Sequence, residues 1–258
     1  AAFWIKPPVL FKAFTRLLQL CVPIFFFGRN NMKISNFFLP FDIFCRHKTV
    51  AKLIGNQEGE ILDVGGGVKG LNRFVKNKVV VSNLKEGDVL ADGRALPFAD
   101  NSFSLVTSID VLEHIPPQDR EKFVSELGRV AKKRVILSFP LGTETHIRAE
   151  KELKDFLKKK GEEVDYLEEH IANGLPTLKE LEKILKNHPF QIFFGENFRL
   201  NNFLLKVQFA LGEKRVLGRF YFYFQKLINF LLNVFYYPFS LSEKPRRFTN
   251  RAYVVINK

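Results

Sequence analysis

The stretch ILDVGGG, residues 61–67, decides the fold of this chain. A short, largely apolar run over residues 60–64 leads directly into three consecutive glycines, Gly65, Gly66 and Gly67. This pattern predicts a buried strand that ends in a tight turn. Glycines at such a turn let a ligand reach the backbone, and the N-terminus of a following helix favours negative charge. The stretch therefore predicts a ligand-binding turn at the end of a strand.

The rest of the chain alternates between strand and helix patterns. Apolar and β-branched runs predict further strands over residues 79–81, 88–91, 103–109, 135–139, 190–194 and 252–256. Helical spacing predicts helices over residues 71–76, 118–133, 151–160 and 177–187, the last one capped by Thr177 with Glu180 three residues on. This alternation is typical of an α/β fold with a doubly wound sheet, which binds its ligand beyond the carboxyl ends of the strands.

Two stretches carry a resemblance to a known family. ILDVGGG and ADGRALPFADNSFSLVTSIDVLEHI, residues 91–115, resemble the class I S-adenosylmethionine-dependent methyltransferases, and among them the branch called type 11. The resemblance covers residues 48–139, with 252–256 as the seventh strand. It implies a seven-stranded Rossmann-like sheet, S-adenosylmethionine (SAM) as the cofactor and methyl transfer as the reaction.

The resemblance also implies a cofactor site. Asp63 would face the methionine amino group, since a buried carboxylate suits the positive charge of the cofactor. The other implied cofactor-binding residues are Gly65, Gly66 and Gly67, then Asn83 for the ribose, Asp92, Gly93 and Leu96 for the adenine, and Asp110 where cofactor and substrate meet. The chain departs from the family pattern at two positions. Lys69 stands where another glycine is common, and Asn83 stands where an acid is usual, with Glu86 and Asp88 nearby.

Glu113, His114 and His170 are the candidate residues on the substrate side. His114 is the candidate catalytic base, because an imidazole titrates near neutral pH. The alternative is that Glu113 and His114 cap the following helix, since methyl transfer depends mainly on proximity and alignment. His170 falls in the region that covers the substrate cavity in this family, or else lies on the surface. No His-x-x-x-His or paired-cysteine motif occurs, so no metal is expected.

Charge and phenylalanine gather at the two ends of the chain. The chain has 258 residues, a net charge of +13 and 29 phenylalanines. Residues 59–140 carry a net charge of +1 and 5 phenylalanines, whereas residues 1–58 carry +6 and 10, and residues 191–258 carry +8 and 12. We therefore divide the chain into a basic aromatic amphipathic segment, 1–45, a SAM-binding core, 46–194, a basic aromatic helical insertion, 195–250, and a closing strand, 251–258.

The basic aromatic ends allow more than one interpretation. Their apolar runs contain Pro23 and Pro238 and are too short for a spanning helix. Basic and aromatic residues mixed at helical spacing favour amphipathic helices that lie in a membrane interface. The alternatives are packing of one end against the other, a dimer interface, and stacking on nucleic acid.

These observations predict a peripheral membrane methyltransferase that acts on an O or C atom of an amphiphilic or lipid-linked small molecule. Two cysteines, Cys21 and Cys45, fit a reducing compartment, so we expect a cytoplasmic location. One alternative is an RNA methyltransferase that binds phosphates with its basic ends. Nucleic acid is the less favoured partner, because the positive charge is interleaved with long apolar runs. The other alternative is a non-catalytic module of the same fold that binds a membrane or a partner protein.

Overall fold

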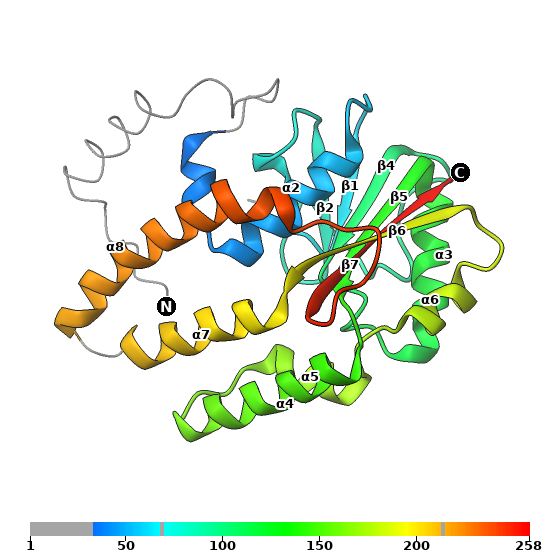
Figure 1. The fold of residues 1–258 in the computed structure, drawn as a ribbon. Coiled ribbons are helices and arrows are strands. Elements are labelled where there is room, and N and C mark those ends of the chain that lie inside the picture. Colours follow the sequence, from blue (N-terminus) through cyan, green and yellow to red (C-terminus); the bar gives the residue numbers. More distant parts are fainter. Residues whose placement is uncertain (1–32, 68–69, 213–214) are drawn as a thin grey trace.

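A seven-stranded sheet forms the centre of the molecule. The computed structural model describes residues 33–67, 70–212 and 215–258 (Figure 1). The strands follow the order β3-β2-β1-β4-β5-β7-β6 across the sheet. Their bounds are β1 Ile61–Val64, β2 Val79–Asn83, β3 Val89–Leu90, β4 Phe103–Ile109, β5 Ala131–Pro140, β6 Phe190–Asn197 and β7 Thr249–Asn257.

The pairing of the strands confirms the predicted fold class. β3, β2, β1, β4 and β5 pair in parallel, and β7 runs antiparallel to both β5 and β6. The register places Asp63 of β1 beside Val81 of β2 and Thr107 of β4. The carboxyl ends of the parallel strands therefore meet at one edge of the sheet, where the glycine turn also lies.

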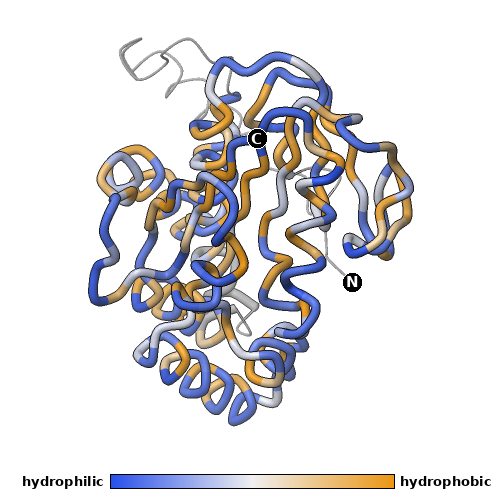
Figure 2. The backbone as a smooth tube through the Cα atoms, turned by 90° about the vertical axis from the view of Figure 1, so that its right-hand side faces the viewer, coloured by the Kyte–Doolittle hydropathy of each residue, from blue (hydrophilic) through white to orange (hydrophobic). Residues whose placement is uncertain are grey.

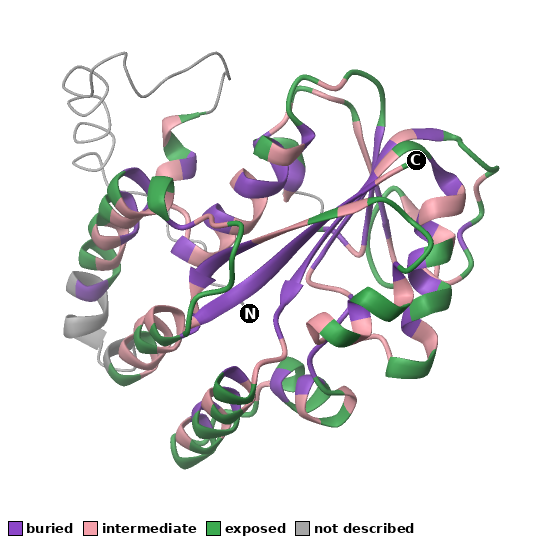
Figure 3. Cartoon of the chain, turned by 45° about the vertical axis from the view of Figure 1, so that its right-hand side comes forward, coloured by how far each residue is buried: buried purple, intermediate pink, exposed green. Residues whose placement is uncertain are grey.

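Helices cover both faces of the sheet. Alternate strand residues point to opposite faces, so Leu62 packs in the cluster that contains Phe123 of α3 (Arg120–Val130), whereas Ile61 packs in the cluster that contains Ile54 of α2 (Phe41–Ile54). On the α3 side, α6 (Leu178–Ile184) adds Leu181. Figure 3 shows the central strands buried along most of their length, and Figure 2 shows apolar stretches along them. This two-sided burial is the doubly wound arrangement.

Several helix bounds differ from the predicted ones. The helix predicted over residues 118–133 ends at Val130, because Ala131 already pairs with Phe103 in the sheet. The helix predicted over residues 71–76 is only a 3₁₀ turn, η3 (Leu71–Arg73). The helix predicted from residue 151 is α4 (Glu144–Lys159), which begins earlier because the Thr143 side chain accepts the first-turn N–H of His146.

Two features of the chain were not anticipated in the predicted segments. A helix that was not predicted, α5 (Asp165–Asn173), follows α4. The boundary at residues 45 and 46 falls inside α2, whose Phe44, Cys45 and Val50 are all buried. Residues 33–45 therefore pack as part of the sheet domain. Residues 1–32, and Lys69 in the glycine region, lie outside the described residues.

The segment between β6 and β7 is helical, as the predicted insertion requires. It contains α7 (Phe198–Gly212), α8 (Arg215–Leu231), a π-helical turn η5 (Leu232–Tyr236) and a 3₁₀ turn η6 (Tyr237–Phe239). α7 packs between α4 and α8, to one side of the sheet (Figure 1). Within the described residues, no helix is both long and apolar enough to cross a membrane.

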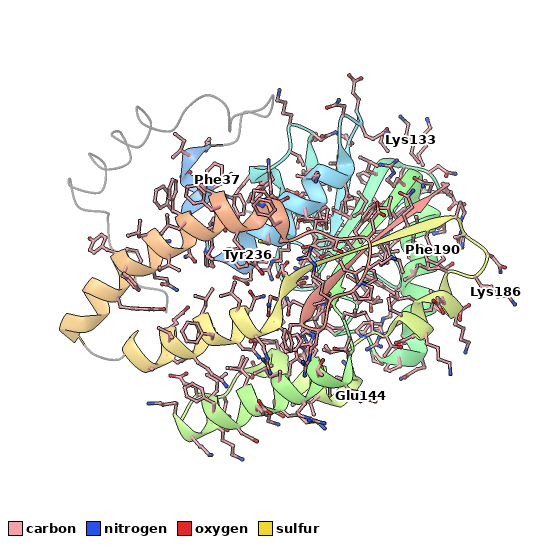
Figure 4. All side chains as sticks on the ribbon, in the orientation of Figure 1. Phe37, Lys133, Glu144, Lys186, Phe190 and Tyr236 are labelled. Carbon is pink, nitrogen blue, oxygen red and sulfur yellow. The ribbon has the colours of Figure 1, made fainter. Side chains whose placement is uncertain are left out.

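Part of the aromatic surplus packs the two ends of the chain together. η2 (Ile34–Phe38) lies against α8 and η5, and Phe37 and Tyr236, on these neighbouring elements, are labelled in Figure 4. The rings of Phe38 and Phe230 stack with centroids 5.2 Å apart. The Asn233 amide donates hydrogen bonds to two backbone carbonyls beside η2, at 2.9 and 3.0 Å. One face of α8 is therefore buried against η2. This packing agrees with the alternative in which the two ends of the chain pack against each other.

Candidate active site

The glycine turn follows β1 and leaves the backbone open to a ligand. Gly65 adopts φ +78°, a conformation that side chains rarely adopt, and a Cβ there would overlap Val111. A Cβ at Gly66 would overlap the Asp63 carboxylate, whereas a Cβ at Gly67 would meet no atom within 4 Å. The turn is therefore closed on its inner side and open at the exposed Gly67.

Asp63 lies beneath this turn as a buried carboxyl group. Only 1% of the residue is exposed, and one carboxylate oxygen accepts a hydrogen bond of 2.8 Å from the Thr107 hydroxyl. Burial raises the pKa of Asp63 to about 7, against the opposing effect of the Thr107 hydrogen bond. Among the described residues no cation pairs with Asp63 at salt-bridge distance. A cationic group of a ligand would stabilise the ionised form.

Asn83 holds the glycine turn against the end of β2. Its side-chain N–H group donates to the carbonyl oxygens of Gly65 and Gly66, at 3.2 and 3.1 Å. The side-chain oxygen of Asn83 lies 3.4 Å from the backbone nitrogen of Lys85. The amide donors are thus used by the turn, and a role for Asn83 at a ribose stays a prediction that rests on its oxygen.

The residues predicted for the adenine lie together, each already in contact with other groups. The Asp92 carboxylate accepts hydrogen bonds from the backbone and the guanidinium of Arg94, and these bonds lower the pKa of Asp92. A Cβ at Gly93 would overlap the Phe123 ring, so this position requires glycine for packing as well. Leu96 is buried in the main core. The adenine assignment stays a prediction.

A cavity of about 450 Å³ lies beside the carboxyl ends of β4 and β5. Its walls come from α2, α4, α5, α7 and α8, and its lining includes predicted residues Asp110, Glu113, His114 and His170. Apolar side chains of α4 and α7, among them Leu153, Leu204 and Leu205, complete the lining. The structure therefore brings the three predicted substrate-side residues into one cavity together with Asp110, which was predicted to bind the cofactor.

A partly buried network of charges forms one wall of this cavity. Asp110 is held between the guanidinium groups of Arg46 and Arg251. Although burial opposes it, the charges of Arg251 and Arg46 hold the pKa of Asp110 well below its usual range. Arg251 also donates to the carboxylate of Glu196 at 3.0 Å.

Two acids of this network adopt an uncommon backbone conformation. Asp110 has φ +56° and Glu196 has φ +60°, in the left-handed region that favours glycine. Both carboxylates converge on Arg251, and the Tyr253 hydroxyl also donates to Glu196, at 2.9 Å. Strained residues that are held by buried ion pairs are typical of functional sites. Sequence reasoning missed Arg46, Glu196 and Arg251, because they lie on three elements far apart in the chain.

Two histidines of the cavity, His114 and His170, are each oriented by a carboxylate. The His114 Nδ1 lies 2.5 Å from the Glu169 carboxylate, and the His170 Nδ1 lies 3.0 Å from that of Glu150. His170 is 6% exposed, which contradicts the alternative that it lies on the surface. The N-cap residues of the turn η4 (Pro117–Asp119) and of α3 are Pro116 and Asp119, so in the described part of the chain neither Glu113 nor His114 is the N-cap of either element.

Glu113 is almost fully buried beside these histidines. Burial, and then the charge of Asp110, raise the pKa of Glu113 well above its ordinary value. Its Oε2 atom has no hydrogen-bond partner among the described residues. The cavity therefore combines a fixed anion, Asp110, with an acid that lacks a compensating donor.

Comparison with known proteins identifies part of this chain. The family model described as "Methyltransferase domain" matches residues 62–139, which run from β1 through the glycine turn to β5. Residues 62–139 therefore match a methyltransferase domain, in agreement with the resemblance seen in the sequence. Domains of this type use SAM as their methyl donor, as the resemblance in the sequence implied. A comparison with curated proteins found no match.

Solved structures agree with the fold of the methyltransferase domain. Phosphoethanolamine N-methyltransferase 2 of Haemonchus contortus, in complex with SAM, is similar over 90% of this chain and 59% of its own, at 18% identity and a TM-score of 0.50. The YcgJ protein of Bacillus subtilis is similar over 83% of this chain and 97% of its own, at 14% identity and a TM-score of 0.46. The [4+2]-cyclase SpnF shares 12% identity, with 83% and 80% coverage and a TM-score of 0.48.

The residues at the end of β1 fit SAM. The cofactor carries a cationic amino group and a sulfonium, and Asp63 is a buried carboxylate without a cation among the described residues. The turn is narrow at Gly66 and open at Gly67, as a backbone cradle for the cofactor requires. Asp63, Gly65, Gly66 and Gly67 are therefore the residues that would hold the methionine part of SAM.

Proposed function

We propose that this chain is a peripheral membrane methyltransferase that uses SAM to methylate an O or C atom in the polar part of an amphiphilic acceptor. One observation carries the proposal: a cavity lined by both charged and apolar side chains is bordered by α8, which carries exposed apolar side chains. A soluble acceptor would need the cavity but not the exposed apolar side chains.

The residues of the glycine turn account for the cofactor. When bound, SAM supplies a methyl group that passes from its sulfonium sulfur to the acceptor, leaving S-adenosylhomocysteine. Asp63 would bind the amino group, and the open backbone at Gly67 would allow close approach. Val111, which contacts Gly65, directly follows the cavity residue Asp110, so the two sites share one stretch of chain.

The composition of the cavity supports an amphiphilic acceptor. Charged and hydrogen-bonding groups, among them Asp110, Arg251 and Asn250, form one part of the lining. Leu204, Leu205 and Leu153 form another part, contributed by α7 and α4. Such a lining suits a molecule with a polar head and an apolar body. Asp110, fixed as an anion between two arginines, would orient the polar head.

The outer face of α8 supports contact with a membrane. Leu227, Leu231 and Phe235 follow at intervals of four residues and are 41%, 40% and 61% exposed. Next to these side chains on the same segment, Phe230 and Val234 pack against Phe38 of η2. α8 and η5 therefore carry an exposed apolar stripe along the edge of their buried contact, which supports a segment that lies in a bilayer interface.

Vesicle flotation tests the membrane part of the proposal. We expect the full chain to float with anionic vesicles. The double variant Leu231→Asp and Phe235→Asp should bind them at least about tenfold more weakly, because charges replace apolar side chains that the bilayer would bury. Leu90→Asp, which changes a leucine that is 66% exposed on β3, is the matched control and should float like the parent chain. Equal flotation of the parent chain and the double variant would exclude α8 as the contact.

Transfer of a labelled methyl group tests the catalytic part. The chain is incubated with methyl-labelled SAM and a lipid extract, and labelled products are identified by mass spectrometry. We expect label in an amphiphilic product. Label in RNA without vesicle binding would favour the RNA methyltransferase alternative. Vesicle binding with no calorimetric binding of SAM would favour a non-catalytic module.

A further inference from the structure

We propose that Glu113, His114 and His170 form a binding site for one divalent transition-metal ion in the wall of the substrate cavity. One carboxylate oxygen of Glu113 and one ring nitrogen of each histidine lie within 4.8 Å of one another. Donors about 2.0–2.1 Å from a tetrahedral ion are about 3.4 Å apart, so modest side-chain rotation would close the set around an ion. The sequence did not predict this site, because two ligands are adjacent and the third comes from α5.

Two atoms of this cluster have no partner although they are buried. Glu113 is 1% exposed and its Oε2 lacks a hydrogen bond, and His170 is 6% exposed and its Nε2 lacks one, among the described residues. Leaving a buried polar atom without a partner costs about 1–3 kcal/mol, and more for a charged group. A metal ion between them would satisfy both atoms.

The Nδ1 atoms of His114 and His170 each contact a carboxylate, as the ring nitrogen that does not bind the metal does in many metal sites. The Glu150 carboxylate lies 3.0 Å from the His170 Nδ1, which leaves Nε2 as the free nitrogen of that ring. The Glu169 carboxylate lies 2.5 Å from the His114 Nδ1. A carboxylate on the far nitrogen fixes the tautomer and orientation of a metal-binding histidine. The two ring centroids are 5.0 Å apart, so both imidazoles border the same space.

The cavity lining has more carboxyl groups than guanidinium groups, which favours the binding of a cation. Four carboxyl groups, those of Asp42, Asp110, Glu113 and Glu150, line the cavity, and only two guanidinium groups, those of Arg46 and Arg251, line it with them. Asp110 is already neutralised by both arginines. Glu113 and Glu150, on the histidine side, have no arginine or lysine within salt-bridge distance in the described part of the chain.

The ligand set indicates the class of ion and its use. Two imidazole nitrogens and one carboxylate oxygen suit Zn²⁺, Fe²⁺ or Mn²⁺ rather than Ca²⁺, which takes oxygen ligands only. Three protein ligands leave a coordination position open to the cavity, as in catalytic metal sites. In this use, which rests on the proposed function, an oxygen of the acceptor would occupy the open position and be held and polarised there.

Zinc titration of the tag-free full chain tests the site. We expect calorimetry to give one Zn²⁺ per chain, and Glu113→Gln and His170→Gln each to weaken its binding by more than about 100-fold. Glu150→Gln leaves the three ligands in place and should weaken binding by about 10–100-fold. His188→Ala changes an exposed histidine and is the matched control, which should bind like the parent chain.

The outcomes separate this proposal from the proposed function. No binding by the parent chain, or equal binding by the parent chain, Glu113→Gln and His170→Gln, would overturn the site. Circular dichroism and SAM affinity show whether each variant is folded, and Glu150→Gln decides the matter if a ligand variant unfolds. Zinc binding without methyl transfer would leave the site standing and refute the function. Methyl transfer at full rate by a chain that binds no zinc would refute the metal site and support the proposed function.

Discussion

Replacement of Asp63 by asparagine should stabilise the protein, and the gain should grow with pH. The pKa of Asp63 is raised by burial to about 7, from an ordinary value of 3.8. The unfolded chain therefore releases this proton at a lower pH than the folded chain does. The contribution of Asp63 to stability is fully retained below about pH 4, falls as the pH rises toward 7, and stays low above 7. Asparagine has no proton to lose and keeps the shape of the side chain.

The size of the effect follows from the same pKa. A rise from 3.8 to about 7 corresponds to a cost of up to about 4 kcal/mol for the ionised group in the folded state. For a chain of this size, each kcal/mol changes Tm by about 2–4 °C. Asp63→Asn and the parent chain should therefore melt together near pH 4, and the variant should melt about 8–16 °C higher at pH 8.

The assay is thermal and urea unfolding of both proteins, without SAM, from pH 4 to pH 8. Asp155→Asn, on the exposed side of α4, is the control for the loss of one acidic group and should follow the parent chain at every pH. The reasoning is refuted if Asp63→Asn is no more stable than the parent chain at pH 8, or if the difference between them does not change with pH.

Three further outcomes are expected. Asp92→Ala should weaken SAM binding by about tenfold or more in calorimetry, because a charged acceptor for the adenine amino group is lost; unchanged affinity would exclude the adenine assignment. Gly66→Ala should lower both Tm and SAM affinity, since the added Cβ would overlap the Asp63 carboxylate, whereas Gly128→Ala, where an added Cβ meets no atom within 4 Å, is the control and should lower neither. Arg251→Leu should destabilise the chain by about 3–5 kcal/mol in urea unfolding, because it leaves the buried Glu196 and the half-buried Asp110 without this partner. A change below about 1 kcal/mol would refute this account of the network.

The sheet could be predicted from the sequence because its strands are short apolar runs between clear breaks. All seven predicted strands overlap observed ones, and the prediction over residues 103–109 coincides with β4. The ends of the helices were harder to predict. The run after Val130 contains Lys132 and Lys133, which suit a helix surface, yet pairing with β4 draws Ala131 into β5. A contact between two strands sets this boundary, and the local sequence pattern does not indicate that contact.

The candidate site could be predicted only where its residues are close in sequence. Asp63 and the glycines share one turn, and Glu113 and His114 follow one strand, so motifs reveal them. Arg46 and Arg251 lie 205 positions apart and meet only because α2 and β7 both reach the end of β4. The partners of the histidines, Glu150 and Glu169, lie on α4 and α5, of which α5 was not predicted.

α7 and α8 are inserted in the sheet at a position remote from the turn after β1. The helices leave after β6 and return before β7 at positions that face each other, since Asn197 pairs with Thr249. The segment between these residues begins and ends at one point, so its length and composition can vary without a change in strand register. The cofactor turn belongs to β1, on the other side of β4 and β5. Exchange of this segment would therefore alter the part of the cavity wall that α7 and α8 provide and leave the turn after β1 as it is.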